Sequence, residues 1–345
     1  MQVSEQVAKQ LYDLCQGKPF DTDLSKKIAA LLSPGPTSTA SHLQNVGPVA
    51  VLGLGAMGKG IAGCLEKGGV VTKKWNRSSV PERTAETIEA AVAGGVNVVF
   101  TMLADDVAVS AVSDELFKHL SKGAIHVSLS TISVRTTKRL EKDHSERGFG
   151  FVSCPVFGRP GKKNKFVFKT NSIIAKDAAA KGILFALPGG DSKAIEMVTP
   201  YLQLFTQKLF RFEKPEQSSL AKLCGNFFIL TQIEALGEIF CAAEKGGISN
   251  RNLLDMFLGT IFNSPIVNRY GNILVNREFS PAGFQMNLGL KDCRFFLEAC
   301  EDERSPAPFA SIVKDRFLQT LADAEKNHLD WSAIFLSIRE SSGLK

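Results

Sequence analysis

A glycine pattern directly after a short apolar run constrains this chain most. Residues 49–52 read Val-Ala-Val-Leu and predict a buried strand, and the next six residues follow the pattern G-x-G-x-x-G. In such a turn the first glycine permits the tight bend, the second lets a pyrophosphate approach the backbone, and the third lets the next helix pack closely. We expect that helix over 59–67, with its N-terminal amides facing the phosphates. The predicted cofactor-binding residues of this turn are Gly53, Leu54, Gly55, Ala56, Met57 and Gly58.

A glycine-rich turn without a ligand would fit the same six residues, so the surrounding elements matter. Apolar runs bounded by turn signals predict strands, and segments with helical spacing lie between them. Strands that alternate with helices indicate a parallel sheet covered on both faces. The predicted strands are 48–53, 70–75, 96–103, 124–129 and 149–153, the predicted helices are 106–120 and 134–147, and candidates for further strands are 184–187 and 208–212.

The pattern changes after Glu213. Residues 218–245 lack proline and are rich in apolar side chains, which predicts one long helix between two halves of the protein. Residues 250–345 are helical by pattern, with predicted breaks at Pro265, Gly271, Pro281 and Pro306–Pro308. The predicted fold is α/β: an N-terminal Rossmann-type doubly wound sheet followed by an all-α C-terminal domain. The predicted domains are a helical extension with a linker over 1–46, a nucleotide-binding domain over 47–213 and a helical domain over 214–345.

Composition narrows the class of protein. A length of 345 residues suggests about two domains, and a net charge of +6 is too mild to favour a nucleic-acid partner. No apolar run approaches the length of a membrane span, so we expect no membrane partner. The seven cysteines are dispersed without a C-x-x-C pair, which predicts reduced thiols in a cytoplasmic protein, and the five histidines lack metal-ligand spacing, which predicts no metal.

The end of the second strand bears on the choice of cofactor. NAD-binding units usually place an acidic residue there to hold the ribose 2′-hydroxyl. Here the chain reads Trp75-Asn76-Arg77-Ser78 with no carboxylate. A guanidinium at Arg77 can pair with a 2′-phosphate, which predicts NADPH in preference to NADH. The alternative is that Arg77 is an ordinary exposed arginine.

Several motifs now line up in order, and from about residue 47 to the C-terminus the chain resembles the β-hydroxyacid dehydrogenase family. That family includes 3-hydroxyisobutyrate dehydrogenase and the glyoxylate/succinic semialdehyde reductases, with a 6-phosphogluconate dehydrogenase-type NADP-binding domain. The related imine reductases are similar too. The matching motifs are the glycine turn at 53–58, Asn76-Arg77-Ser78, Met102-Leu103-Ala104-Asp105, Ser130-Thr131-Ile132-Ser133, Lys222-Leu223-Cys224-Gly225-Asn226 and Lys291-Asp292.

The resemblance implies roles for individual residues. The implied catalytic residues are Lys222 and Asn226. The implied substrate-binding residues are Ser130, Thr131, Gly158 and Lys222. Besides the glycine turn, the implied cofactor-binding residues are Asn76, Arg77, Ser78, Met102, Leu103, Ala104, Thr131 and Lys291.

The chemistry supports a lysine in this role. Hydride transfer to a carbonyl leaves a developing alkoxide, and an ammonium supplies both a proton and a positive charge. Lys222 and Asn226 lie four residues apart and share one face of the predicted helix, so Asn226 is a candidate to hold the ammonium or the substrate. A solvated helix lysine is the alternative for Lys222, and a surface salt bridge with Asp292 or a neighbouring residue is the alternative for Lys291.

The hydroxyls of the Ser130-Thr131 step follow a predicted strand at the carboxyl edge of the sheet, where such folds bind ligands. They and nearby backbone amides are candidates to hold a substrate carboxylate. A plain helix cap, with Ser133 as the capping residue, fits the same segment.

Three segments depart from the family pattern. The family usually has Ser-Gly-Gly after a Pro-Val step, whereas this chain continues as Phe157-Gly158-Arg159-Pro160, which removes a hydroxyl and leaves Arg159 as a candidate anion contact. Residues 161–176 look like an insertion rich in Lys, Asn, Ile and Phe, and one hypothesis is a translated intron. Between 79 and 96 there is room for about one helix, so we expect the sheet to lack a strand beside the adenine pocket.

These residues lead to one main functional hypothesis and two alternatives. The main one is an NADPH-dependent oxidoreductase that reduces a small aldehyde or keto acid to a hydroxy acid, with Lys222 as general acid. An imine reductase-like enzyme is the first alternative, which Lys222 disfavours because imine reductases commonly carry another residue there. A non-catalytic NADPH-binding module is the second. The family tends to assemble through its helical domain, so a homodimer or homotetramer is expected.

Overall fold

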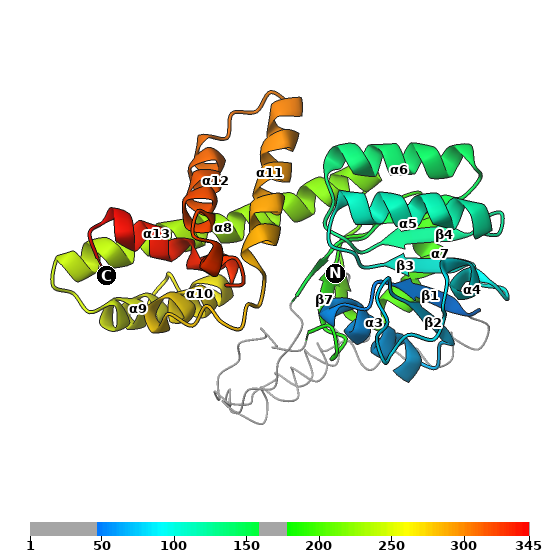
Figure 1. Ribbon diagram of the computed structural model, residues 1–345, viewed down its shortest axis with the longest axis horizontal. Helices are drawn as coiled ribbons and strands as arrows, with labels where there is room; N and C mark the ends of the chain where they lie inside the picture. The colour runs from blue at the N-terminus through cyan, green and yellow to red at the C-terminus, as the bar shows by residue number, and fades with distance from the viewer. Residues whose placement is uncertain (1–46, 159–177, 345) are drawn as a thin grey trace, which may run out of the picture. The chain divides into compact units, whose positions relative to one another are not determined.

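The computed structural model describes residues 47–158 and 178–344 (Figure 1). The predicted extension and linker over 1–46, the insertion over 161–176 and the candidate anion contact Arg159 lie outside the described residues. The described part has a half built on a sheet and a helical half after it, which is the fold class that the sequence predicts.

The main sheet has six strands in the order β2-β1-β3-β4-β5-β8. Neighbouring strands from β2 to β5 pair in parallel, and β8 pairs with β5 in the antiparallel sense. The strands are β1 (Val49–Leu52), β2 (Thr72–Trp75), β3 (Val98–Thr101), β4 (Ile125–Ser128), β5 (Gly150–Ser153) and β8 (Gly189–Gly190), and the helices of this half are α3 (Ala56–Lys67), α4 (Ile88–Val92), α5 (Asp106–His119), α6 (Val134–Glu146) and α7 (Ser192–Leu202).

Helices cover the sheet on both faces, which explains why β1, β3 and β4 are buried along their whole length. On one face Ala50 and Val99 share an apolar cluster with residues of α4 and α5. On the other face the Phe100 ring meets the rings of Tyr201 and Phe205 edge-on, at centroid distances of 6.2 and 5.9 Å. Successive side chains along these strands therefore pack into two separate hydrophobic cores, one on each face of the sheet.

Strand β2 is the outermost strand, because α4 alone connects it to β3. The short 79–96 segment predicts this loss of a strand. An exposed strand edge would leave backbone groups unpaired. Here the loop before α4 pairs with the backbone of Lys74: the amides of Thr84 and Ala85 donate to the Lys74 carbonyl at 2.9 and 3.0 Å, and the Lys74 amide donates to Thr84 Oγ1 at 2.9 Å.

A second, three-stranded sheet is built from segments that follow β5 in the chain. It consists of β6 (Val156–Phe157), β7 (Leu184–Ala186) and β9 (Thr206–Leu209) in the order β6-β7-β9. The candidate strand at 184–187 belongs to this small sheet, and so does the start of the one at 208–212, whose last residue Phe212 forms an isolated parallel bridge to Gly189 of β8. Pro155 has no N–H to donate to a ladder, and β5 ends two residues before it.

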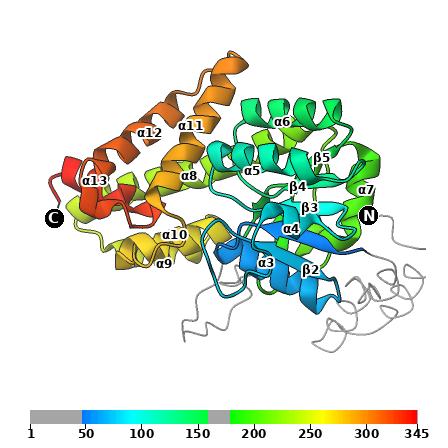
Figure 2. The same ribbon diagram turned by 45° about the vertical axis from the view of Figure 1, so that its right-hand side comes forward.

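Helix α8 (Pro215–Lys245) joins the two halves, and both views in Figures 1 and 2 show it passing from the sheet to the helical cluster. Near its start, Ser218 donates to the Ser153 carbonyl at 3.1 Å, and the Ser219 hydroxyl lies 2.8 Å from Thr137 Oγ1 and 2.9 Å from Ser153 Oγ. Further along, its apolar face enters the core of the helical half. That half contains α9 (Asn250–Leu258), α10 (Pro265–Asn276), α11 (Met286–Asp302), α12 (Pro308–Leu321) and α13 (Ile334–Ser341), with short 3-10 turns at Ala324–Lys326 and Trp331–Ala333.

One predicted helix break is wrong. Gly271 lies inside α10 and does not end it. A Cβ at this position would lie 2.4 Å from a methyl carbon of Leu254, so the glycine lets α9 and α10 approach closely. The packing of Leu254 therefore explains the glycine that sequence reasoning interpreted as a helix end.

The expectation that no apolar run approaches the length of a membrane span also needs correction. By length and composition, α8 could cross a membrane. Half of its most apolar window is buried inside the protein, which is typical of the core helix of a globular fold. Its apolar character is explained by its central position between the two halves.

A chain of buried imidazoles links β3, β4 and α6. Thr101 Oγ1 lies 2.9 Å from His126 Nε2, His126 Nδ1 lies 2.9 Å from His144 Nε2, and His144 Nδ1 lies 2.6 Å from the Leu140 carbonyl. Burial lowers the pKa of His144 to about 4, and burial together with the neighbouring His144 holds the pKa of His126 well below its usual range. Both rings are therefore neutral in the folded protein at pH 7.

This pair predicts a loss of stability in acid. The unfolded histidines bind protons below about pH 6.5, whereas folded His144 does not until the pH approaches 4 and the pKa of folded His126 is also well below its usual range. The free energy of unfolding should therefore fall as the pH falls across this window. The shift at His144 alone corresponds to about 3 kcal/mol. Urea unfolding from pH 7 to pH 4.5 measures it, with His126→Leu/His144→Leu as the variant expected to be less acid-sensitive.

His119, which pairs with Glu115 at 3.2 Å on α5, supplies the matched control. We expect His119→Gln to retain the acid sensitivity of the unsubstituted protein. A free energy of unfolding that stays level from pH 7 to pH 4.5 in the unsubstituted protein would contradict the account.

Candidate active site

The glycine turn begins the site. Helix α3 starts at Ala56, three residues earlier than predicted, so Ala56, Met57 and Gly58 form its first turn. Gly53 has a φ of +100°, which only glycine adopts readily, and a Cβ there would lie 2.4 Å from the Met102 carbonyl oxygen. A Cβ at Gly58 would lie 1.9 Å from the Gly53 carbonyl oxygen. These two glycines are therefore required by the protein's own packing.

Gly55 differs from its neighbours, because a Cβ added to it would meet nothing within 4 Å. Gly55 is also the N-cap of α3, and no side chain caps the helix there. Backbone N–H groups at an uncapped helix start favour an anion. The open space in front of Gly55 and the uncapped amides fit the pyrophosphate of a dinucleotide.

Asn76 shapes this turn from the end of β2. Its Oδ1 accepts from the Leu54 amide at 2.9 Å, and its Nδ2 donates to the Ser78 hydroxyl and carbonyl at 2.9 and 3.0 Å. The side-chain amide of Asn76 thus ties the glycine turn to the segment that carries Arg77. Arg77 itself is exposed at the end of the strand, where a guanidinium can reach a bound ligand.

The loop after β3 is held in a similar way. The Leu103 amide donates to Ser130 Oγ at 2.8 Å, which joins residues 102–104 to the loop after β4. Ser130 is 1% exposed. Ser133 caps α6, because its hydroxyl accepts from the Thr136 amide at 3.0 Å, and it also donates to Asp106 Oδ2 at 2.6 Å. The helix-cap interpretation of this segment is therefore correct for Ser133.

A buried carboxylate connects α8 and α11 to that same loop. Asp292 is 1% exposed, and its Oδ2 accepts from Asn226 Nδ2 at 2.6 Å. Its Oδ1 lies 3.1 Å from the ammonium of Lys291, which donates to the Thr131 carbonyl at 2.6 Å. The contacts Asn226–Asp292–Lys291–Thr131 thus form one chain, which we call the Asp292 network.

The Asp292 network refines two expectations. Lys291 does pair with Asp292, but the pair is largely buried, so it is no surface salt bridge. Asn226 directs its amide nitrogen to Asp292. The asparagine therefore positions α11 against α8, a role that the four-residue spacing from Lys222 did not reveal.

Lys222 is 8% exposed, which excludes the alternative of a solvated helix lysine. Its ammonium lies 3.9 Å from the centroid of the Phe157 ring. Gly158 is exposed beside that ring, with a φ of +136°, and a Cβ there would lie 2.3 Å from a Leu184 methyl carbon. The small sheet thus brings Phe157 from β6 against α8 and leaves Gly158 at the edge of this contact.

Comparisons with known proteins agree with these features. Residues 48–165 match the family model of the NAD-binding domain of 6-phosphogluconate dehydrogenase, and residues 217–338 match that of the NAD-binding region of NADP-dependent 3-hydroxyisobutyrate dehydrogenase. An uncharacterized oxidoreductase of Bacillus subtilis is 33% identical over 84% of this chain and 99% of its own length. The chain belongs to the β-hydroxyacid dehydrogenase family. It is accordingly an NAD(P)-dependent oxidoreductase that acts on CH–OH groups.

Two further proteins are similar to this chain over a comparable share of its length, at lower identity. Glyoxylate/succinic semialdehyde reductase 1 of Arabidopsis thaliana is 26% identical, covering 85% of this chain and 99% of that protein. The solved structure of Mycobacterium tuberculosis 3-hydroxyisobutyrate dehydrogenase with L-serine covers 85% of this chain and 99% of its own, with a TM-score of 0.72 and 24% identity. This chain therefore has the same fold as that solved structure.

Sequence reasoning gave no role to three residues that shape this site. Asp292 was considered only as a surface salt-bridge partner of Lys291, and nothing in the spacing shows that its carboxylate would be buried and would bind Asn226. Asp106 directly follows the motif at 102–105, but only the structure shows that it accepts hydrogen bonds from Ser133. Phe157 did leave a signal, because it stands where the family usually has a serine.

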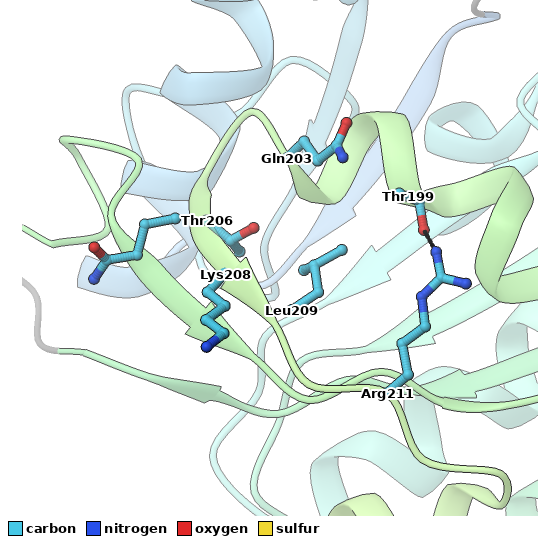
Figure 3. Close-up of a pocket in the computed structure, with 7 residues that line it drawn as sticks. Thr199, Gln203, Thr206, Lys208, Leu209 and Arg211 are labelled. Carbon is cyan, nitrogen blue, oxygen red and sulfur yellow. Dashed lines mark hydrogen bonds between the residues drawn. The ribbon is translucent and has the colours of Figure 1, made fainter. Parts of the chain in front are cut away.

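A separate recess of about 320 Å³ lies between α7 and β9 (Figure 3). In Figure 3, Arg211 reaches Thr199, and the distance between Nη2 and Oγ1 is 3.2 Å. None of the sequence-predicted site residues lines this recess. Its lining consists of Thr199, Gln203, Thr206, Gln207, Lys208, Leu209 and Arg211.

The two glycines at either end of G-x-x-G give a matched test of the cofactor site. We expect Gly55→Ala to leave the melting temperature of the ligand-free protein within about 2 °C, because the new Cβ meets open space, and to weaken NADPH binding about tenfold or more. Gly58→Ala should instead lower the melting temperature, because its Cβ collides with the Gly53 carbonyl. Thermal melts and fluorescence titration separate the two effects. NADPH binding unchanged in Gly55→Ala would contradict the assignment.

Proposed function

We propose that this β-hydroxyacid dehydrogenase reduces a small aldehyde or keto acid to a hydroxy acid with NADPH. The observation that carries the proposal is the position of Lys222, buried on α8 one turn before Asn226. The Asp292 network ties that turn of α8 to the Thr131 carbonyl in the loop after β4. A lysine in this position serves as the general acid.

The proposed cofactor contacts follow from the same geometry. The backbone of residues 53–58 would bind the pyrophosphate, and residues 102–104 together with Thr131 and Lys291 would bind the nicotinamide end. Arg77 would pair with the 2′-phosphate, held near the glycine turn by Asn76. No carboxylate follows β2 directly, so a 2′-phosphate meets no like charge from this segment.

The proposed substrate contacts lie at the loop after β4. The Ser130 hydroxyl accepts from the Leu103 amide and keeps its own hydrogen for a substrate oxygen. Thr131 precedes α6, whose capping by Ser133 fixes the direction of the loop. Gly158 stays a proposed contact on the opposite wall, beside Phe157.

In the proposed mechanism the bound cofactor supplies the hydride. Lys222 Nζ donates a proton to the oxygen of the carbonyl as negative charge develops on it, which is worth typically about 10²- to 10⁴-fold in rate. Asn226 keeps its turn of α8 in register with α11 through Asp292. Burial of Lys222 keeps water away from the ammonium and so strengthens its electrostatic effect.

We further propose a homodimer or homotetramer in the cytoplasm. Apolar side chains on α8 and α12 remain exposed, among them Phe228, Ile239, Phe309 and Ile312, and such a surface suits a second copy of the chain. The six cysteines among the described residues are free thiols, which supports a reducing compartment.

The first test is turnover of glyoxylate and succinic semialdehyde by the purified chain, followed by NADPH absorbance. We expect turnover, and we expect Lys222→Ala to lower kcat by about 10²-fold or more while NADPH still binds, because the acid is lost and the glycine turn is untouched. Turnover by Lys222→Ala at the unsubstituted rate would rule out the acid. Clear NADPH binding without turnover of any carbonyl would support a non-catalytic module instead.

A second test concerns Arg77. We expect Arg77→Ala to raise KM for NADPH about tenfold or more, and to leave KM for NADH within about twofold, because only NADPH carries the 2′-phosphate. Arg83, whose guanidinium hydrogen-bonds the Ala85 carbonyl at 2.8 Å and Glu86 Oε2 at 2.6 Å, supplies a control arginine in the same region. Equal changes in KM for the two cofactors would overturn the role of Arg77.

A further inference from the structure

We infer that Phe157 and Gly225 act together as a positioning pair for Lys222. Phe157 holds the ammonium, and Gly225 makes room for the ring. The inference rests on the proposed function, because it assigns Lys222 the role of the acid. It adds a residue from the small sheet, and a glycine on α8, to the machinery of that acid.

The first observation is the contact between the ring and the ammonium. Lys222 Nζ lies 3.9 Å from the Phe157 centroid, well within the distance of about 6 Å over which a cation is attracted to an aromatic face. Lys222 is also buried, so the attraction acts with little competition from water. The ring therefore attracts the ammonium and restricts the directions in which it points.

The second observation is independent and concerns the backbone of α8. Gly225 follows Lys222 by three residues, so both lie on one side of the helix. A Cβ at Gly225 would lie 2.3 Å from Phe157 Cζ and 2.9 Å from Cε1. Any larger residue would push the tip of the ring away, although glycine weakens a helix interior relative to alanine. The glycine is explained by the space that it leaves for the Phe157 ring against α8.

Together these contacts define what Phe157 does. Its ring bridges the bare backbone at Gly225 and the ammonium of Lys222, so it sets the position of the ammonium relative to α8. It covers one side of the acid and leaves the proton to be donated elsewhere. Phe157 is therefore a positioning residue that acts through Lys222.

A double-mutant cycle tests the pair. We expect Phe157→Leu to lower kcat about tenfold with KM for NADPH unchanged, because leucine fills space without attracting the cation. Gly225→Ala should lower kcat by a similar factor, because its Cβ displaces the ring. In the double variant the second substitution should cost no further activity, since leucine lacks the ring tip that the Cβ strikes.

The surface supplies a matched control, because Lys208 Nζ on β9 lies 4.8 Å from the ring centroid of Phe210, which directly follows that strand. Phe210→Leu removes the same kind of contact at a residue that is 43% exposed, and we expect it to leave kcat unchanged. Losses in kcat that simply multiply in the double variant, or a Phe157→Leu variant with full kcat, would overturn the inference.

A cycle of melting temperatures keeps the inference testable without turnover. Gly225→Ala should lower the melting temperature of the chain with Phe157, and should leave it level or raise it slightly in the Phe157→Leu background, because alanine then improves the helix. This reversal would support the contact between Phe157 and Gly225 even if the protein turned over no substrate. The absence of turnover would count against the proposed function and not against the pair. An equal loss in both backgrounds would overturn the pair.

Discussion

The buried carboxylate of Asp292 is the constraint on which the rest of the site depends. A carboxylate that is 1% exposed is stable only if other groups compensate its charge. Asn226 on α8 donates to one carboxylate oxygen, and the Lys291 ammonium on α11 lies 3.1 Å from the other and donates to the Thr131 carbonyl after β4. One charge thus fixes the helix that carries Lys222 relative to the loop at the carboxyl edge of the sheet.

Other polar contacts extend the same principle to the cofactor loops. Asn76 holds the glycine turn, Ser130 holds the loop after β3, and Asp106 accepts from the Ser133 amide and hydroxyl at 2.9 and 2.6 Å. These bonds join segments that follow different strands of the main sheet. Such ties reduce the rearrangement needed when a ligand binds, which is how a protein gains affinity and catalytic power from preorganisation.

The sequence predicted the features that depend on local pattern. The period of apolar residues located the strands, and G-x-G-x-x-G located the start of α3 to within three residues. Contacts between distant segments could not be predicted from the sequence. The burial of Asp292, its bond from Asn226 and the close packing at Gly271 all depend on how the helices pack. Phe157 is an intermediate case. The sequence shows that it departs from the family pattern, but only the structure shows its contact with Lys222.

The most direct test of the central claim is a crystal structure of the chain with NADPH bound. The account predicts the pyrophosphate at the backbone of Gly55 and the nicotinamide end beside Thr131, on the side where α8 presents Lys222. Phosphates bound away from the glycine turn, or a nicotinamide remote from Lys222, would contradict the claim that the Asp292 network assembles the active site.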